Sequence, residues 1–199
     1  MQSKRTGLFF GSFNPIHIGH LAIANYFVEF SGIAELWFVV SPQNPFKEKN
    51  SLLPERQRLH MLNLAIGNDP RLKTCDIEFT LPRPNYTVDT LTYLREKHPE
   101  NTFALIMGSD NLAGFHKWKN YQEILKHHPL MVYPRPGFDK SGMSNTHHAE
   151  WVMAPQMDIS SSVLRKAIMD GHNMKYYFAE AVWNYIDEMN FFKTGKPSS

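Results

Sequence analysis

Residues 11–20 of the 199-residue chain read Gly11-Ser12-Phe13-Asn14-Pro15-Ile16-His17-Ile18-Gly19-His20. This stretch follows a short apolar run at 6–10 and precedes a helical pattern that begins near Ile18, so it is predicted to join a strand to a helix. A helix N-terminus offers unpaired N–H groups and the positive end of the helix dipole, and both favour a bound phosphate. His17 and His20 are predicted to face the same side, as neutral hydrogen-bond donors that become protonated once a polyanion binds.

Two other interpretations of this histidine pair stay open at this point. One histidine could cap the helix while the other packs in the core. Alternatively, the pair could bind a metal, although zinc enzymes usually combine histidines four residues apart with a nearby acidic ligand, and residues 11–24 contain no Asp or Glu. The position of the loop between a strand and a helix favours phosphate binding.

Apolar runs and amphipathic stripes alternate along the rest of the chain. Strands are predicted at 6–10, 35–40, 72–79, 103–107, 130–133 and 151–154. Helices are predicted from 18 to a cap at Gly32, at 54–66, from 87, at 121–126, at 160–170 and around 178–189. The first helix is expected to face the core with Ile23, Tyr26, Phe27 and Phe30, and the last with Phe178, Ala181, Val182, Tyr185, Ile186 and Met189.

This alternation predicts an α/β fold built on a single Rossmann-like, doubly wound and mostly parallel sheet, with a C-terminal helical extension. In such sheets, ligands bind at the carboxyl ends of the strands. We expect residues 1–192 to form one domain, residues 41–53 and 134–150 to be loops, and residues 193–199 to be a disordered tail.

Composition excludes several classes of protein. With 42% apolar and 13% aromatic residues the chain can bury a core, and a net charge of +2 argues against a non-specific nucleic-acid binder. The longest apolar run, at 36–40, is too short to cross a bilayer, and no secretory signal is evident, so we expect a cytoplasmic protein without membrane or nucleic-acid partners. The single cysteine, Cys75, is expected to be a small buried residue.

A second candidate anion site is the stretch Ile159-Ser160-Ser161-Ser162-Val163-Leu164-Arg165. Serines at a helix start can cap its N–H groups or bind an anion there, and Arg165 lies about one turn away. Taken alone, the stretch could equally be an ordinary N-cap followed by a solvated arginine.

The loop resembles the Gly-x-Phe-x-Pro-x-His-x-Gly-His signature of a nucleotidyltransferase superfamily, and residues 159–165 resemble its second signature, Ile-Ser-Ser-x-x-Ile-Arg, with Leu164 in place of Ile. Further segments resemble those of the bacterial nicotinate mononucleotide adenylyltransferases: Pro84-Asn85-Tyr86-Thr87-Val88-Asp89-Thr90-Leu91, Gly108-Ser109-Asp110-Asn111-Leu112 with Phe115 and Trp118, and Val132-Tyr133-Pro134-Arg135-Pro136-Gly137. The resemblance extends over nearly the whole chain.

The resemblance implies transfer of AMP from ATP to nicotinate mononucleotide, giving the deamido dinucleotide and pyrophosphate in NAD synthesis. It also implies Mg²⁺ on the triphosphate, with no metal ligand from the protein. The implied catalytic residues are His17, His20, Lys47 and Arg165. The implied ATP and phosphate site comprises Gly11, Ser12, Phe13, Gly19, Gly108, Asp110, Arg135, Ile159, Ser160 and Ser161, and the implied pyridine nucleotide site comprises Tyr86, Thr87 and Trp118. One departure is Phe46, where the family often has histidine.

Residue types suggest how the two nucleotides would bind. Trp118 can stack on a flat pyridine ring, the N–H groups at Tyr86 and Thr87 suit a carboxylate, and Asp110 can accept hydrogen bonds from ribose hydroxyls. Several alternatives stay open. The acceptor could be nicotinamide mononucleotide or phosphopantetheine, and the protein could instead be a histidine-rich metallohydrolase or a non-catalytic nucleotide-binding protein. The sequence does not determine the preference between nicotinate and nicotinamide mononucleotide, nor the oligomeric state, for which a homodimer is one option.

Overall fold

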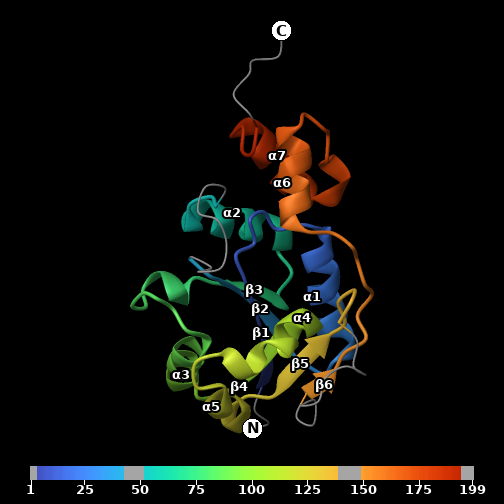
Figure 1. Cartoon of the computed structure of the whole chain (residues 1–199). Coiled ribbons are helices and arrows are strands. Elements are labelled where there is room, and N and C mark those ends of the chain that lie inside the picture. The colour runs from blue at the N-terminus through green and yellow to red at the C-terminus, as the bar shows by residue number, and fades with distance from the viewer. Residues whose placement is uncertain (1–3, 43–51, 139–148, 194–199) are drawn as a thin grey trace.

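A computed structural model describes residues 4–42, 52–138 and 149–193. Within these ranges, six parallel strands form one sheet in the order β3-β2-β1-β4-β5-β6 (Figure 1). The strands are β1 (Lys4–Gly11), β2 (Glu35–Val40), β3 (Leu72–Cys75), β4 (Asn101–Gly108), β5 (Leu130–Tyr133) and β6 (Ala149–Trp151). The Rossmann-like α/β prediction is confirmed. The strand order reverses between β1 and β4, which opens a crevice at their carboxyl ends.

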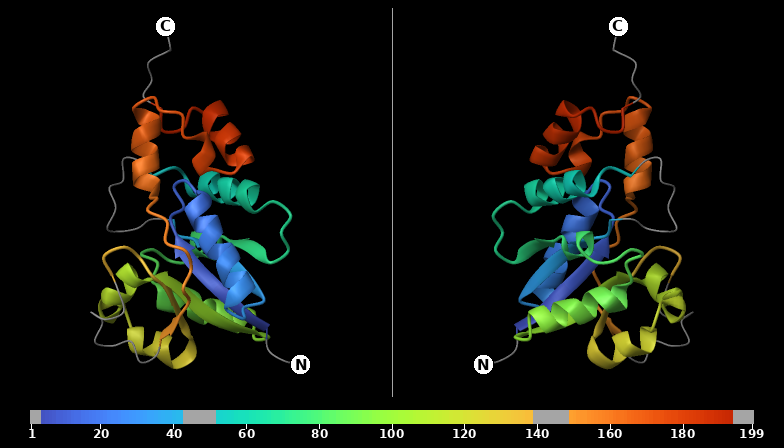
Figure 2. Two further views of the ribbon diagram at one scale, coloured as in Figure 1. Left: turned by 90° about the vertical axis from the view of Figure 1, so that its right-hand side faces the viewer. Right: turned by 90° about the vertical axis from the view of Figure 1, so that its left-hand side faces the viewer.

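Helices cover both faces of the sheet. One face packs against α1 (Ile18–Phe30) and α2 (Glu55–Ile66), and α6 (Ser161–Met169) and α7 (Glu180–Glu188) continue the same core. The other face packs against α3 (Thr87–Lys97), α4 (Ser109–Ala113) and α5 (Tyr121–His127). Short 3-10 turns lie at Ile77–Phe79, Phe115–Lys117 and Lys175–Tyr177. Figure 2 shows the C-terminal helices stacked at the end of the molecule opposite the N-terminus.

The two cores follow the alternation of side chains along each strand. In β1, Phe9 faces the α1 side while Leu8 faces the α3 side, and in β4 Ile106 and Leu105 divide in the same way. All six residues of β2 are buried, as expected for a strand covered on both faces. The continuous apolar runs in the sequence therefore mark inner strands.

Several expected details were wrong. The strand predicted at 72–79 ends at Cys75, and Ile77–Phe79 forms a 3-10 turn in which Glu78 is buried and accepts a hydrogen bond from Thr90. The last strand occupies Ala149–Trp151 rather than 151–154, because the chain turns away after Val152 donates to Val132. The predicted core-facing sets of the first and last helices were also too large, because Phe30, Ala181 and Met189 are exposed.

Some sequence predictions lie outside the described residues. The gap at 43–51 contains Phe46 and Lys47, and the gaps at 139–148 and 194–199 contain most of the second predicted loop and the tail. Cys75 is buried, as predicted. Among the helices that are described, none is long and apolar enough to cross a membrane.

Candidate active site

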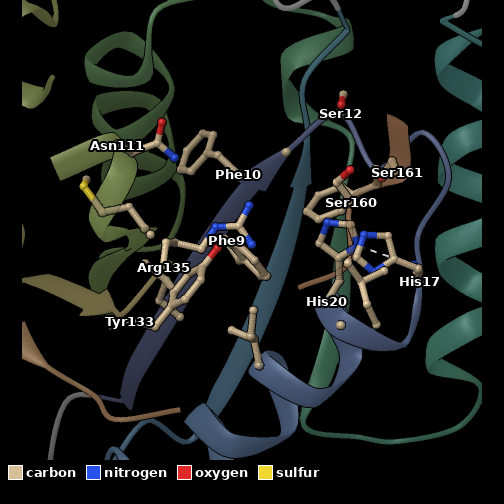
Figure 3. A pocket seen from close by; sticks show the side chains of 18 of the residues that line it. Phe9, Phe10, Ser12, His17, His20, Asn111, Tyr133, Arg135, Ser160 and Ser161 are labelled. Carbon is tan, nitrogen blue, oxygen red and sulfur yellow. Dashed lines mark hydrogen bonds between the residues drawn. The ribbon is translucent and has the colours of Figure 1, made fainter. Parts of the chain in front are cut away.

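A cavity opens at the carboxyl ends of β1 and β4, where the strand order reverses. Two walls enclose it. Figure 3 shows His17, His20, Ser160 and Ser161 on one side, facing Tyr133, Arg135 and Asn111 on the other. Predicted site residues that line it are Gly11, Ser12, Phe13, His17, Gly19, His20, Gly108, Trp118, Arg135, Ile159, Ser160 and Ser161. Residues more than a hundred positions apart in the sequence thus meet in one space.

The two histidines lie together at the start of α1. His17 is the N-cap residue of the helix, and its N–H donates to Nδ1 of His20 at 3.3 Å. Their ring centroids are 3.7 Å apart, and the His20 ring meets the Phe13 ring edge-on at 5.2 Å. The predicted common orientation of the pair is therefore present. It arises from the three-residue spacing at the helix start.

Burial controls the charge of His17. Its side chain is 4% exposed, and burial, with the positive charge of Arg135, lowers its pKa to about 4. The ring is therefore neutral near pH 7. A polyanion in the cavity would oppose the effect of Arg135 and favour protonation.

Close packing explains two glycines of the site. A Cβ at Gly11 would lie 2.8 Å from the ring of Phe13, and one at Gly108 would lie 2.3 Å from Oδ1 of Asp110 and 2.9 Å from Cγ of Arg135. The Phe13 ring is therefore what approaches Gly11 most closely. Phe13 adopts a φ of 44°, in the left-handed region that non-glycine residues rarely occupy.

The start of α6 supports the loop as well as lining the cavity. Oγ of Ser160 caps the helix by accepting from the N–H of Val163 at 3.3 Å. Ser161 donates to the carbonyl of Pro15 at 3.0 Å, and Nη1 of Arg165 donates to the carbonyl of Asn14 at 2.7 Å. Ser160 is thus the N-cap of α6, the alternative that the sequence left open beside anion binding. The Arg165 side chain contacts the loop backbone and does not line the cavity.

The opposite wall is built from the ends of β4 and β5. Arg135 lies two residues after the end of β5, and its N–H donates to Oγ of Ser109, the first residue of α4, at 2.8 Å. Its Nε lies 3.9 Å from Oδ1 of Asp110, a predicted site residue that does not line the cavity. Trp118 packs against Phe115 with ring centroids 5.3 Å apart and faces the cavity.

Tyr86 and Thr87 form the start of α3 and do not line this cavity. Tyr86 is 40% exposed, and Nζ of Lys119 lies 4.2 Å from the centroid of its ring and 3.0 Å from Oδ2 of Asp89. Lys119 follows Trp118 in the chain, so this contact connects the α3 start to the Trp118 wall.

Sequence reasoning missed part of the lining, chiefly apolar residues near strand ends. Tyr133 is the clearest case: it is 8% exposed, burial raises its pKa to about 12, and it meets Phe9 edge-on. Nothing in a core strand pattern separates such residues from ordinary core. The additional lining residues are Phe9, Phe10, Ile23, Leu105, Ile106, Met107, Asn111, Tyr133, Met157 and Ser162.

A doubly wound parallel sheet, with two helix starts, two histidines and an arginine around the crevice where strand order reverses, defines a Rossmann-like nucleotide-binding enzyme. Comparison with known proteins specifies the class further. Residues 8–167 match the family model described as cytidylyltransferase-like, and the chain belongs to this nucleotidyltransferase family, within the branch of the nicotinate-nucleotide adenylyltransferases.

Two curated relatives define that branch. The chain is 50% identical over 193 residues to the probable nicotinate-nucleotide adenylyltransferase of Christiangramia forsetii, which covers 96% of this chain and 100% of the relative. It is 49% identical over 191 residues to the protein of the same name from Flavobacterium psychrophilum, covering 95% and 99%. The family and enzyme class expected from the sequence are thereby confirmed.

Solved structures share the fold. The nicotinic acid mononucleotide adenylyltransferase of Plasmodium falciparum, solved in complex with NaAD, superposes with a TM-score of 0.79 at 22% identity, covering 95% of this chain and 97% of that one. A structure of a putative nicotinate-nucleotide adenylyltransferase from Vibrio parahaemolyticus gives a TM-score of 0.72 at 18% identity, with 96% of each chain covered.

Proposed function

We propose that this chain transfers the adenylyl group of ATP to the phosphate of nicotinate mononucleotide, releasing pyrophosphate, in the cavity at the ends of β1 and β4. The names of the curated relatives and the NaAD bound to the Plasmodium enzyme support this substrate pair. The observation that carries the proposal is the meeting of the His17–His20 helix start, the Ser160–Ser161 helix start and Arg135 around a single cavity.

The chemistry proposed here asks mainly for positioning and charge stabilisation. The acceptor phosphate is already an oxyanion, so it needs no strong general base. One of its oxygens forms a bond to the α-phosphorus of ATP, while the bond from that phosphorus to the bridging oxygen breaks and pyrophosphate leaves with the electron pair. The enzyme therefore has to bring two polyanions into line and stabilise the charge on the α-phosphate and the leaving group.

His17 and His20 are proposed to donate hydrogen bonds to the phosphates, with Gly11, Ser12, Phe13 and Gly19 shaping the loop around them. Arg135, Ser160 and Ser161 are proposed to add positive charge and donors from the other segments. Lys47, outside the described residues, and Arg165 are proposed to complete the catalytic set. Because Arg165 binds the carbonyl of Asn14, its contribution in this arrangement includes holding the loop in place.

Gly108 and Asp110 are proposed to belong to the ATP site, with Asp110 accepting hydrogen bonds from ribose hydroxyls. On the acceptor side, Trp118 is proposed to stack on the pyridine ring. Ile159 would pack near the nucleotide. Tyr86 and Thr87 are proposed to present the N–H groups of the α3 start to the ring carboxylate, which requires that start to approach the cavity.

Mg²⁺ is proposed to accompany ATP and to neutralise part of the triphosphate charge. Among the residues described, no group of three or more histidines, cysteines or acidic side chains is arranged to hold a metal ion. We assign the ligands of Mg²⁺ to the phosphates and water, because Mg²⁺ prefers oxygen ligands and usually keeps several waters. Residues 1–192 would form the single catalytic domain.

The test is to incubate the purified chain with ATP, Mg²⁺ and each acceptor separately: nicotinate mononucleotide, nicotinamide mononucleotide and phosphopantetheine. We expect pyrophosphate release to be fastest with the nicotinate form, with the dinucleotide as the second product. A preference for phosphopantetheine would contradict the roles of Trp118 and Tyr86. ATP binding without pyrophosphate release under any acceptor would indicate a nucleotide sensor, and stoichiometric zinc would indicate a metallohydrolase.

A further inference from the structure

The side chain of Arg58, in the first turn of α2, is fully buried. It takes part in none of the ion pairs found among the described residues. Burial lowers its pKa to about 10, which leaves the guanidinium charged at neutral pH. The negative charge of Glu55 opposes this shift, and a buried charge also needs strong hydrogen bonds to offset the cost of burial.

Four main-chain carbonyls supply those interactions. Nε of Arg58 donates to the carbonyl of Leu53 at 2.9 Å. Nη1 donates to the carbonyls of Ser12 at 2.5 Å and Ser41 at 2.9 Å, and Nη2 donates to that of Pro42 at 2.9 Å. Each bond is strengthened by the positive charge of the donor. The planar guanidinium, with its donors fixed in direction, thus binds carbonyls from three separate stretches of chain.

One of these stretches belongs to the lining of the cavity, and the other two lie at the ends of neighbouring elements. Ser12 lines the cavity as part of the loop after β1, Ser41 and Pro42 follow β2 directly, and Leu53 precedes α2. The N–H of Leu53 also donates to Oδ1 of Asn14 at 3.1 Å, so the same loop has a second connection to the start of α2. One side chain therefore joins the loop after β1 to the end of β2 and to the start of α2.

The contact with Ser12 also fixes the direction of the next amide. Because the peptide unit is planar and trans, a Ser12 carbonyl that points at Arg58 leaves the N–H of Phe13 pointing to the opposite side. Phe13 is held at a φ of 44°, a conformation that is strained for a non-glycine residue and needs support from its surroundings. The hydrogen bond from Arg58 to the Ser12 carbonyl provides part of that support.

We propose that Arg58 is a positioning residue for adenylyl transfer: it does not touch substrate, but locks the Ser12–Phe13 turn in the geometry that binds phosphate. This inference rests on the proposed function. A lysine offers a single ammonium centre in place of a planar set of donors and cannot satisfy the same carbonyls.

The test compares Arg58→Ala and Arg58→Lys with the unaltered enzyme, using kcat, the KM for ATP and the affinity for a non-hydrolysable ATP analogue by calorimetry. We expect both variants to lower kcat by about 100-fold, the scale for a small misplacement of reacting groups. We also expect millimolar guanidinium chloride, far below denaturing concentrations, to restore at least about tenfold of the lost rate in Arg58→Ala, because the free cation fits among the same carbonyls. Urea should give no rescue.

Leu62→Ala is the matched control, because Leu62 is fully buried in the same helix and its apolar side chain cannot donate to the carbonyls that Arg58 binds. It should lower the melting temperature but keep kcat per folded molecule and show no guanidinium rescue. Folded Arg58→Ala with kcat within about threefold of the unaltered enzyme would overturn the proposal, since displaced reacting groups should cost far more. Failure of both Arg58 variants to fold would overturn it in favour of a purely structural role.

A failure of the proposed function would look different. In that case the unaltered enzyme itself would release no pyrophosphate with nicotinate mononucleotide. The calorimetric comparison would still test Arg58, because weaker binding of the ATP analogue to Arg58→Ala, and its recovery with guanidinium, require no turnover.

Discussion

The buried neutral His17 should make the protein sensitive to acid. Its pKa is about 4 in the folded chain, against about 6.5 for an exposed histidine. The unfolded chain therefore binds this proton more tightly than the folded chain. As a result, the free energy of unfolding falls as the pH drops through the window from about 6.5 to 4, and the stability is fully present above about pH 6.5.

The size of the effect follows from the two pKa values. Between pH 8 and pH 5, His17 should remove about 2 kcal/mol from the free energy of unfolding, and about 3 kcal/mol below pH 4. For a chain of this size, 2 kcal/mol corresponds to a fall of about 4 to 8 °C in melting temperature.

The measurement is urea denaturation of the unaltered protein and of His17→Gln at several values of pH from 8 to 5. His128 is also buried with a lowered pKa, so only the difference between the two proteins isolates His17. His172→Gln, which removes an exposed histidine, measures the effect of losing a histidine outside the cavity. We expect the unaltered protein to lose about 2 kcal/mol more than His17→Gln between pH 8 and pH 5. An equal dependence of the unfolding free energy on pH in the unaltered protein and in His17→Gln would contradict the effect assigned to His17. Saturating ATP should reduce the effect, because its negative charge favours the protonated ring.

Three further outcomes are expected. His20→Ala should lower kcat by at least about 100-fold with the fold intact by circular dichroism, the usual loss for one transition-state contact, and unimpaired turnover would rule out its proposed role. Trp118→Leu should raise the KM for nicotinate mononucleotide about tenfold or more by loss of stacking, as measured by steady-state kinetics, while the KM for ATP stays unchanged; an unchanged acceptor KM would count against a pyridine at this wall. Ser161→Ala should lower the free energy of unfolding in urea by about 1 kcal/mol, because the carbonyl of Pro15 loses its donor. Thr92→Ala is the control, because it removes an exposed hydroxyl that donates a hydrogen bond within its own helix. An equal loss of unfolding free energy in both variants would contradict the stabilising effect of the Ser161–Pro15 hydrogen bond.

Local patterns predicted most of the elements, since short-range periodicity decides whether a segment can form a helix or a strand. The strands at 35–40 and 130–133 and the helix from 87 were placed correctly because their apolar runs, prolines and caps lie within the segments themselves. The strand predicted at 72–79 failed after Cys75, because the chain there turns to bury Glu78 against Thr90, which the local pattern does not reveal.

Local patterns were enough to predict the strand–loop–helix that carries His17 and His20, the parallel sheet and the family, because each depends on neighbouring residues or on a motif with fixed spacing. The contacts of Arg58 and Arg165 depend instead on how distant parts of the chain pack together. In the sequence each is one polar residue in a helix, yet Arg58 is buried against a carbonyl 46 positions away, and Arg165 binds one 151 positions away. The physical reason is that a charged side chain in a helix is solvated unless other parts of the chain close over it, and no local pattern records which parts will do so.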